Sequence, residues 1–372
     1  MLQVSRRAIN LYKILCCALL ICINLMFQFD GNKQLVGFFM AFGAIFFGIL
    51  SILFVQFAMN FKFCLRDLIV LATLIILQVI CLIFRNTDGL IIVIASLFFF
   101  FLNTKDIVKI YFYALTIVLL IVALSSFIGV LPMMADGFPV FGFGYKNRIG
   151  FIIFSIALYI FFIIELREAN KKEELIGFII LVIALFFERL VQDRTALILI
   201  LFFIMLYFLH IFRINNVVMQ ILTVSLPVIL IIFSLFLTFN FLKIQWIFKL
   251  NEWLSWRIGL WNNDWNMYGV TLFPQQINSY FSYTTSYGQF MTITALDGYF
   301  ALGILKNGAI FFLISILALM NMLYFNFKNM DRQKELIICL TVTFILYSFS
   351  ETLPVIGYLC FLFPTAMCFK KD

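Results

Sequence analysis

Long apolar runs occupy most of this 372-residue chain and leave little room for charge. Hydrophobic residues make up 65% of the sequence, charged residues make up 12%, and there is one histidine. A water-soluble chain of this length could not cover its surface with so few charged side chains. The composition therefore predicts a polytopic protein embedded in a lipid bilayer, and it excludes soluble enzymes and nucleic-acid-binding proteins.

Twelve apolar runs come close to the length that a helix needs to cross a bilayer, about 20 residues. Backbone donors inside lipid must be satisfied within the segment, so these runs are expected to be helices. The shortest, 89–102, is expected to be tilted, re-entrant or extended into 103–106. The runs cover residues 11–29, 35–59, 67–84, 89–102, 109–130, 148–166, 174–190, 195–212, 217–240, 298–325, 335–350 and 353–369. The expected fold is all-α, with about 12 transmembrane helices in a single membrane domain over residues 1–372.

Basic residues set the expected orientation of these helices. With a cytoplasmic N-terminus, twelve crossings place both termini and most of the 26 basic residues inside, as the positive-inside rule requires. The reverse orientation would violate the rule. The basic residues that remain outside are Lys33, Arg85, Lys146, Arg148, Arg189, Arg194, Lys243, Lys249 and Arg257.

Five of these external residues are arginines, and Arg148, Arg189, Arg194 and Arg257 are the four that need an explanation. Guanidinium is the preferred group for bidentate binding of phosphate and pyrophosphate. A local pair with Glu188 explains Arg189. Arg148, Arg194 and Arg257 are therefore the candidates for binding an anionic substrate. Arg148 follows Asn147 at the entrance to one predicted helix.

The segment around Arg194 predicts a capped helix that begins at the outer face. Asp193 is a plausible N-cap, with Thr195 in the first turn. A helix N-terminus also attracts anions. The cap and a phosphate contact from Arg194 are compatible with each other.

The one long loop is expected outside the membrane, over residues 241–297, and it contains all five tryptophans: Trp246, Trp253, Trp256, Trp261 and Trp265. Apolar residues recur there at helical spacing and predict an amphipathic helix along the outer membrane interface. Anchoring in the interface explains most of the tryptophans. Arg257, Trp256 and Trp261 are assigned to the substrate.

Polar residues near the ends of this loop are the remaining site candidates. Asn262, Asn263 and Asp264 are expected to end the amphipathic helix with side chains suited to sugar hydroxyls or to a turn. Asp297, followed by Tyr299 at the mouth of the next span, is either an N-cap or a group that orients or deprotonates an acceptor.

Charges within the predicted spans are few. Lys306 is expected about two turns into its span, where it is either a functional candidate or a residue that snorkels or pairs with Glu351. His210, at the cytoplasmic end of its helix, is interpreted as a satisfied structural residue. The eight cysteines contain no CxxC pair and predict neither a disulfide framework nor a metal site.

Motifs of soluble catalysis are also missing: the sequence has no Walker, HExxH, GxSxG or DxD-type nucleotide-sugar motif. ATP and a cytosolic activated donor are therefore not expected. What remains is chemistry, or transport, of an anionic and membrane-bound compound on the outer side.

Four motifs, in their order, resemble the Wzy-type polysaccharide polymerases, which belong with the O-antigen ligases in one membrane superfamily. The motifs are GYKNRIG, QDRTAL, SWRIGLW in the long outer loop, and LDGYFALGILKNGAIFF. The resemblance implies an enzyme of the bacterial cytoplasmic membrane that needs no cofactor or metal. It would join undecaprenyl-pyrophosphate-linked oligosaccharide repeat units on the outer face by inverting glycosyl transfer. Its expected protein partners are a flippase and chain-length regulators.

Carried onto the matching positions, the resemblance assigns Arg194 and Arg257 to the donor pyrophosphate, where they would stabilise the leaving group. Of the external carboxylates, Asp297 is chosen to act on the acceptor hydroxyl. These three residues form the expected catalytic set. The residues expected to bind substrate are Arg148, Asn147, Asp193, Trp256, Trp261, Asp264 and Tyr299.

The ligases of the superfamily carry a histidine in the outer loop, and this loop has none, which favours a polymerase.

Two other function classes, a transporter and a non-catalytic scaffold, remain open at this point. A lipid-linked oligosaccharide flippase would also have about a dozen helices, but such transporters usually show internal repeats, and none is evident here. A non-catalytic scaffold is the third class.

Overall fold

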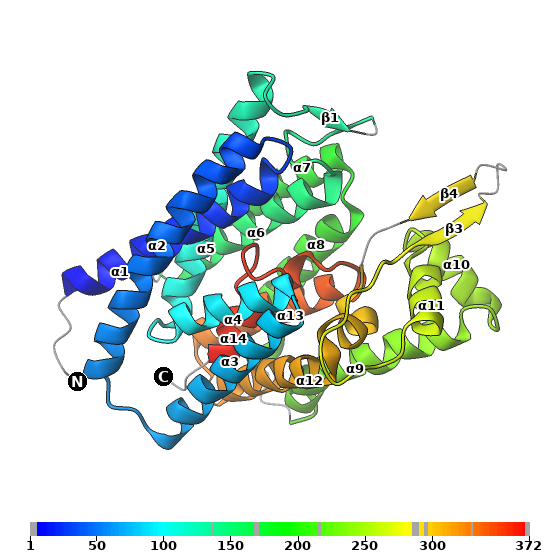
Figure 1. Cartoon of the computed structure of the whole chain (residues 1–372). Helices are drawn as coiled ribbons and strands as arrows, with labels where there is room; N and C mark the ends of the chain where they lie inside the picture. The colour runs from blue at the N-terminus through cyan, green and yellow to red at the C-terminus, as the bar shows by residue number, and fades with distance from the viewer. Residues whose placement is uncertain are drawn as a thin grey trace. The chain divides into compact units, whose positions relative to one another are not determined.

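A computed structural model describes residues 6–135, 137–166, 171–213, 217–284, 290–293, 297–328 and 330–368. These residues form fourteen α-helices, two short 3-10 helices and two small antiparallel hairpins (Figure 1). The first part of the chain contains α1 (Arg6–Gln28), α2 (Lys33–Asn60), α3 (Leu65–Ile83), α4 (Thr87–Phe99), α5 (Thr104–Phe127), β1 (Met134–Ala135), β2 (Phe138–Pro139), α6 (Lys146–Glu165), α7 (Lys171–Val191) and α8 (Arg194–Phe208). The rest contains η1 (Ile211–Arg213), α9 (Val217–Asn240), α10 (Gln245–Trp253), α11 (Arg257–Met267), β3 (Phe281–Thr284), β4 (Phe290–Ile293), α12 (Tyr299–Phe327), α13 (Arg332–Ser350), η2 (Leu353–Val355) and α14 (Leu362–Cys368).

The chain divides into two compact units, and each is described by itself. The first unit comprises Met1–Ala72, Ile94–Met205 and Tyr358–Asp372. The second unit comprises Thr73–Val93 and Leu206–Gly357. The expectation of one membrane domain over the whole chain stays a prediction.

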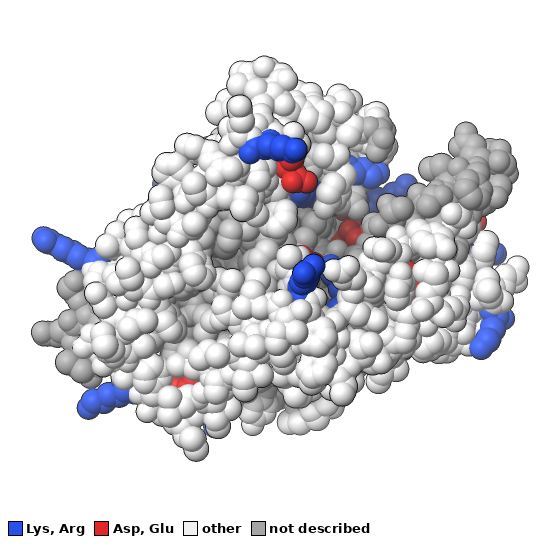
Figure 2. Space-filling view, in the orientation of Figure 1, with Lys and Arg blue, Asp and Glu red and all other residues white. Residues whose placement is uncertain are grey.

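Eight helices of the described residues are long and apolar enough to cross a membrane: α1, α2, α3, α5, α6, α9, α12 and α13. They confirm the prediction of a multi-pass, predominantly helical membrane protein. On the face that Figure 2 shows, Lys, Arg, Asp and Glu side chains are few. A surface this poor in charge suits contact with lipid.

The prediction of twelve membrane-spanning helices is wrong for the described residues. The runs at 89–102 and 195–212 form α4 and α8, which are only 13 and 15 residues long. The run at 174–190 lies in α7, which has acidic residues in its first turn and Arg189 in its last. The run at 353–369 is not one helix, because Pro354 and Gly357 interrupt it and only the seven residues of α14 are α-helical.

The segment that replaces the predicted last helix packs along α1 within the first unit. Asn24 Nδ2 donates to the carbonyl of Tyr358 at 2.8 Å. At the other end of the segment, Cys368 lies close enough to Tyr12 to interact with it electrostatically. Since α1 rises about 18 Å from Tyr12 to Asn24, the segment runs antiparallel to it over that distance. Irregular backbone at this depth is tolerated when protein surrounds it, and nearly every residue of this segment is buried.

Within the second unit, α12 consists of two helical parts joined at Gly308, which has φ 74° and ψ 156°. The loop that follows α11 runs past this break and forms hydrogen bonds with the backbone groups that the break leaves without helical partners. The Ala309 N–H donates to the Thr271 carbonyl at 2.8 Å, and the Gln275 N–H donates to the Lys306 carbonyl at 3.2 Å. A Cβ at position 308 would overlap the backbone of Phe273. Glycine is therefore required both by the positive φ and by the close approach.

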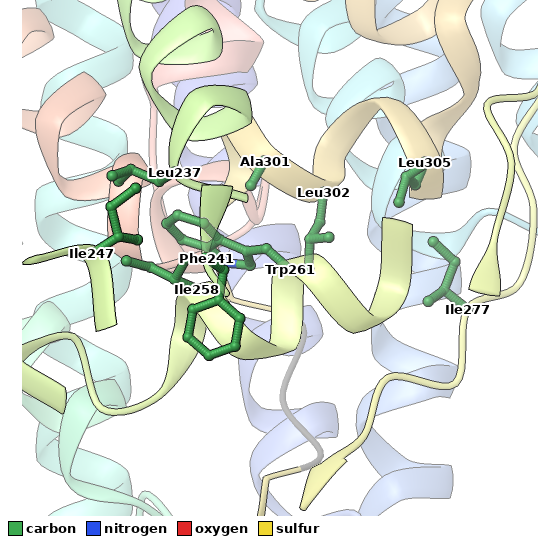
Figure 3. Packing of buried hydrophobic residues seen from close by; sticks show 9 residues of the cluster. All are labelled: Leu237, Phe241, Ile247, Ile258, Trp261, Ile277, Ala301, Leu302 and Leu305. Atoms are coloured by element: carbon green, nitrogen blue, oxygen red, sulfur yellow. The ribbon is translucent and has the colours of Figure 1, made fainter. Parts of the chain in front are cut away.

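One cluster of buried apolar residues joins α10, α11, the end of α9 and the first part of α12 (Figure 3). Trp261 lies among them and is fully buried. The cluster consists of Leu237, Phe241, Ile247, Ile258, Trp261, Ile277, Ala301, Leu302 and Leu305. It fixes the position of α11, which carries Arg257 at its first residue.

Candidate functional site

A tight turn between α10 and α11 sets the direction of Arg257. Ser255 and Trp256 both have positive φ, at 55° and 65°. The buried Asn251 holds the turn, because its carbonyl accepts from the Trp256 N–H at 2.7 Å and its Oδ1 accepts from the Gly259 N–H at 3.0 Å. The prediction of a single amphipathic helix is therefore wrong, because the segment forms two helices, α10 and α11. The turn directs the Arg257 side chain into the interior, where it is largely buried.

Two carboxylates of the second unit bind the guanidinium of Arg257. Its Nε donates to Asp297 Oδ2 at 3.2 Å, and its Nη2 donates to Glu351 Oε1. Burial lowers the pKa of Arg257, but Glu351 and Asp297 more than offset this effect, so the pKa is raised above its ordinary value. Arg257 therefore carries a permanent charge in a site from which most water is excluded.

Each carboxylate is positioned by a different element. Glu351 is the residue directly after α13, and its N–H donates to the Tyr347 carbonyl. The backbone of Asp297 is held by Trp261, whose Nε1 donates to the Asp297 carbonyl at 2.6 Å. Gly298 follows with φ 90°, and a Cβ there would lie 2.5 Å from the Trp261 ring. Asp297 is thus not the N-cap of α12, a position that Gly298 occupies.

The five tryptophans differ in how far they are buried and in what they contact. Trp246 and Trp253 of α10 are 49% and 82% exposed, which suits anchoring in a membrane interface. Trp261 and Trp265 instead donate to backbone carbonyls of Asp297 and Ala301. Trp256 is half-buried and contacts the Phe248 ring edge-on. Of the two tryptophans assigned to substrate, only Trp256 keeps an exposed surface, and Trp261 has a structural role.

The polar residues of α11 already have partners in the structure. Asn262 Nδ2 donates to the Thr238 carbonyl at 2.9 Å, and Asn263 Nδ2 donates to the Tyr280 carbonyl at 2.7 Å. Asp264 accepts a hydrogen bond from the Ser279 hydroxyl. Burial raises the pKa of Asp264 to about 6, although the bond from Ser279 opposes the shift. These residues do not end the helix as predicted, because α11 continues to Met267.

Tyr299 also lies in the interior of the second unit. Its hydroxyl pairs with the Ser315 hydroxyl at 2.7 Å, and its side chain is buried. The roles in substrate binding expected for Tyr299 and Asp264 stay predictions, but burial and existing hydrogen bonds give each residue a structural role.

The first unit brings the other predicted site residues to the beginnings of α6 and α8. Asn147 and Arg148 lie in the first turn of α6. Asp193 accepts from the Ala196 N–H at 3.1 Å, which confirms it as a cap of α8. Its side chain packs directly on the backbone of Gly150. This contact places Asp193 beside the first turns of α6.

The arginines of this region are less completely bound than Arg257. Arg194 is exposed at the first position of α8. The Nε of Arg148 is buried and has no hydrogen-bond partner among the described residues. The predicted pairing of Arg189 with Glu188 is not formed, because Glu188 is buried and Arg189 is exposed.

Two further predictions concern charges elsewhere in the second unit. Lys306 pairs with Asp88 at the start of α4, so its predicted pairing with Glu351 is wrong. The helical part from Ala309 to Phe327 is about 28 Å long and is enough to cross a bilayer by itself. Lys306 precedes this part, and its expected depth in the membrane stays a prediction. His210 Nδ1 lies 3.1 Å from the buried Glu335, as expected of a satisfied structural residue.

Glu351 is the functional candidate that the sequence did not assign to this site. It lies 94 residues from Arg257, and no local pattern joins them. The available signal was that Glu351 is the only charged residue between Glu335 and Lys370, since an isolated charge in an apolar run needs a partner.

Among the described residues, no group of three or more His, Cys, Asp or Glu side chains could hold a metal ion.

Comparisons with known proteins do not assign this chain to a family. No family model matches this chain, and neither the curated proteins nor the solved structures contain a match to it.

Proposed function

We propose that this chain is a glycosyltransferase of the bacterial cytoplasmic membrane that polymerises oligosaccharide repeat units on the outer face. Its substrate is the undecaprenyl-pyrophosphate-linked oligosaccharide that the resemblance to Wzy-type polymerases implies. The observation that carries the proposal is Arg257, a buried guanidinium that Asp297 and Glu351 hold outside the candidate membrane spans. A permanent, fixed charge of this kind suits a pyrophosphate leaving group.

The proposed reaction is an inverting displacement at the anomeric carbon of the donor glycan. An acceptor hydroxyl oxygen forms the new bond to that carbon, and the carbon–oxygen bond to pyrophosphate breaks, with its electron pair leaving on the phosphate oxygen. In the second unit, Arg257 balances the charge that develops there. Asp297, which is partly exposed, accepts the proton of the hydroxyl.

Two features of the first unit support a role in binding an anion. The buried Nε of Arg148 lacks a partner among the described residues, and such a donor costs about 1–3 kcal/mol until a ligand satisfies it. Arg194 is exposed beside the N-terminus of α8, where the helix dipole favours negative charge. Arg148 and Arg194 thus suit phosphate oxygens, with Asp193 and Asn147 beside them.

The proposed topology has both termini in the cytoplasm and α10 in the outer interface, so besides the eight long helices an odd number of α4, α7 and α8 must cross the membrane. The segment beside α1 supports this arrangement, because it leads the chain from Asn24 back toward Tyr12. The exposed Trp246, Lys249 and Trp253 on α10 support an interfacial position. A flippase and chain-length regulators are the proposed protein partners.

The break in α12 favours an enzyme over a flippase. In many transporters, unwound helices use freed backbone groups to bind the substrate or a coupled ion. Here the loop after α11 satisfies those groups, as the bonds from Ala309 to Thr271 and from Gln275 to Lys306 show. The break therefore serves to hold the loop that leads away from Arg257.

A leaflet-resolved assay of lipid-linked repeat units tests the proposal. In a strain that lacks this protein, single repeat units are expected to accumulate on the outer leaflet, and Arg257→Ala is expected to reproduce that state at normal protein level. Lys249→Ala removes a charge from the same loop and serves as the matched control. Accumulation on the inner leaflet would instead identify a flippase.

A further inference from the structure

The Arg257 guanidinium already has carboxylate partners on two of its nitrogens. Nε binds Asp297 and Nη2 binds Glu351, so the three side chains together carry one net negative charge. A pyrophosphate approaching them would meet repulsion at short range. If Arg257 binds the donor, as the proposed function requires, at least one carboxylate must first break its hydrogen bond with the guanidinium.

The two carboxylates are not equally free to leave. The side chain of Glu351 is 3% exposed, whereas that of Asp297 is 20% exposed. The bond from Arg257 to Asp297 is also long for a charge-assisted hydrogen bond, at 3.2 Å. Moving Glu351 would leave a buried and unpaired carboxylate, which costs more than moving a carboxylate that water can reach.

Contacts with Trp261 hold the backbone around Asp297 in place. Trp261 holds the Asp297 carbonyl and packs against Gly298. Separation from Arg257 therefore needs only rotation about the side-chain bonds of Asp297. No helix has to shift, and the carboxylate stays within a side-chain length of Arg257.

We propose that the donor pyrophosphate exchanges with Asp297 on Arg257, while Glu351 remains bound and holds the guanidinium in place. The exchange transfers the Nε donor from Asp297 Oδ2 to a phosphate oxygen. It also frees Oδ2 to accept the hydrogen of the acceptor hydroxyl. Donor binding thus prepares the group that activates the acceptor, and Glu351 is a positioning residue that does not touch the substrate.

Titration of the purified, full-length protein with inorganic pyrophosphate tests the exchange, with binding measured calorimetrically in lipid nanodiscs. Asp297→Asn removes the competing charge, so pyrophosphate should bind about tenfold more tightly than to the wild type, although polymerisation is lost. Glu351→Gln leaves Arg257 with an uncharged amide oxygen in place of its fixed carboxylate, which holds the guanidinium less firmly, so binding should weaken. Glu252→Gln removes an exposed carboxylate of α10 and should leave the affinity unchanged.

Three outcomes would overturn the exchange. Asp297→Asn could leave the affinity unchanged or lower it, or Glu351→Gln could tighten binding as much as Asp297→Asn does. The third is a tightening by Asp297→Asn that persists when Arg257→Met is added. Failure of the proposed function is recognised separately, as a wild-type protein that makes no polymer from lipid-linked units while the affinities still follow the expected order.

Discussion

The two regions that contain the candidate arginines differ in how completely the protein binds them. In the second unit, Arg257 is buried and bonded to two carboxylates. In the first unit, Arg148 has a buried Nε without a partner among the described residues, and Arg194 is exposed. The difference indicates separate tasks. The protein itself holds Arg257 in a set direction, whereas under the proposed function Arg148 and Arg194 would take their partners from a ligand.

The largest effect should follow loss of Arg257, because its charge binds both Asp297 and Glu351. Arg257→Met should lower polymer synthesis by more than about 100-fold. It should also destabilise the protein by about 3 kcal/mol, because Glu351 becomes a buried and unpaired carboxylate. Polymer length on gels and thermal unfolding in detergent measure the two effects.

A double variant separates the structural role of Arg257 from its functional role. Arg257→Met with Glu351→Gln should regain most of the lost stability while polymer synthesis stays absent. If the double variant also regains synthesis, Arg257 acts only through the fold.

The second-largest effect is expected at Arg194, and it should affect activity alone. Arg194→Ala should lower polymer synthesis by about 10- to 100-fold and leave the melting temperature unchanged, because the side chain is exposed. Arg189→Ala, at an exposed arginine of α7, is the control and should retain synthesis. A large fall in melting temperature for Arg194→Ala would contradict the contrast between the two regions.

A smaller effect is expected at Arg148. Arg148→Met should reduce synthesis by less than about tenfold. Because the substitution removes a buried donor without a partner, it should raise stability slightly, by about 1 kcal/mol. Differential scanning calorimetry without and with inorganic pyrophosphate measures both states. Destabilisation comparable to that of Arg257→Met would show that Arg148 is also structurally bound.

The smallest effect is a pH dependence at Asp264, an acid near Arg257 in sequence that has a hydroxyl partner in place of a guanidinium. Burial raises its pKa to about 6 in the folded state, from about 3.9 in an unfolded chain. Between these values the folded state holds a proton that the unfolded state has released, so this contribution to stability falls as pH rises from about 4 to 6. Asp264→Asn should flatten that part of the stability profile, measured by thermal unfolding. An unchanged slope would show that the carboxyl is hydrated.

Local patterns in the sequence predicted the parts of the fold and site that depend on neighbouring residues. Eight of the expected spans were confirmed as long apolar helices, since lipid requires each segment to satisfy its own backbone. Asp193 was recognised as a cap because capping acts within three residues. Arg257 was selected because guanidinium suits phosphate and because it adjoins Trp256 in the external loop.

Other features could not be read from local patterns. The turn at Ser255 and Trp256 interrupts a sequence with continuous helical spacing, and the buried Asn251 stabilises it. The run at 353–369 has the composition of a span, but Pro354 and Gly357 break it, and packing along α1 compensates. Composition measures how well a segment tolerates lipid and does not show whether protein surrounds it.

The sequence alone determined that this chain is a helical membrane protein, and it identified basic residues, such as Arg257 and Lys306, that need partners. Only the tertiary structure decided those partners. Glu351 reaches Arg257 across 94 residues, and Asp88 reaches Lys306 across 218. Helix formation and membrane insertion depend on residues a few positions apart, whereas a buried charge is satisfied by whichever group the packing of distant helices brings within bonding distance.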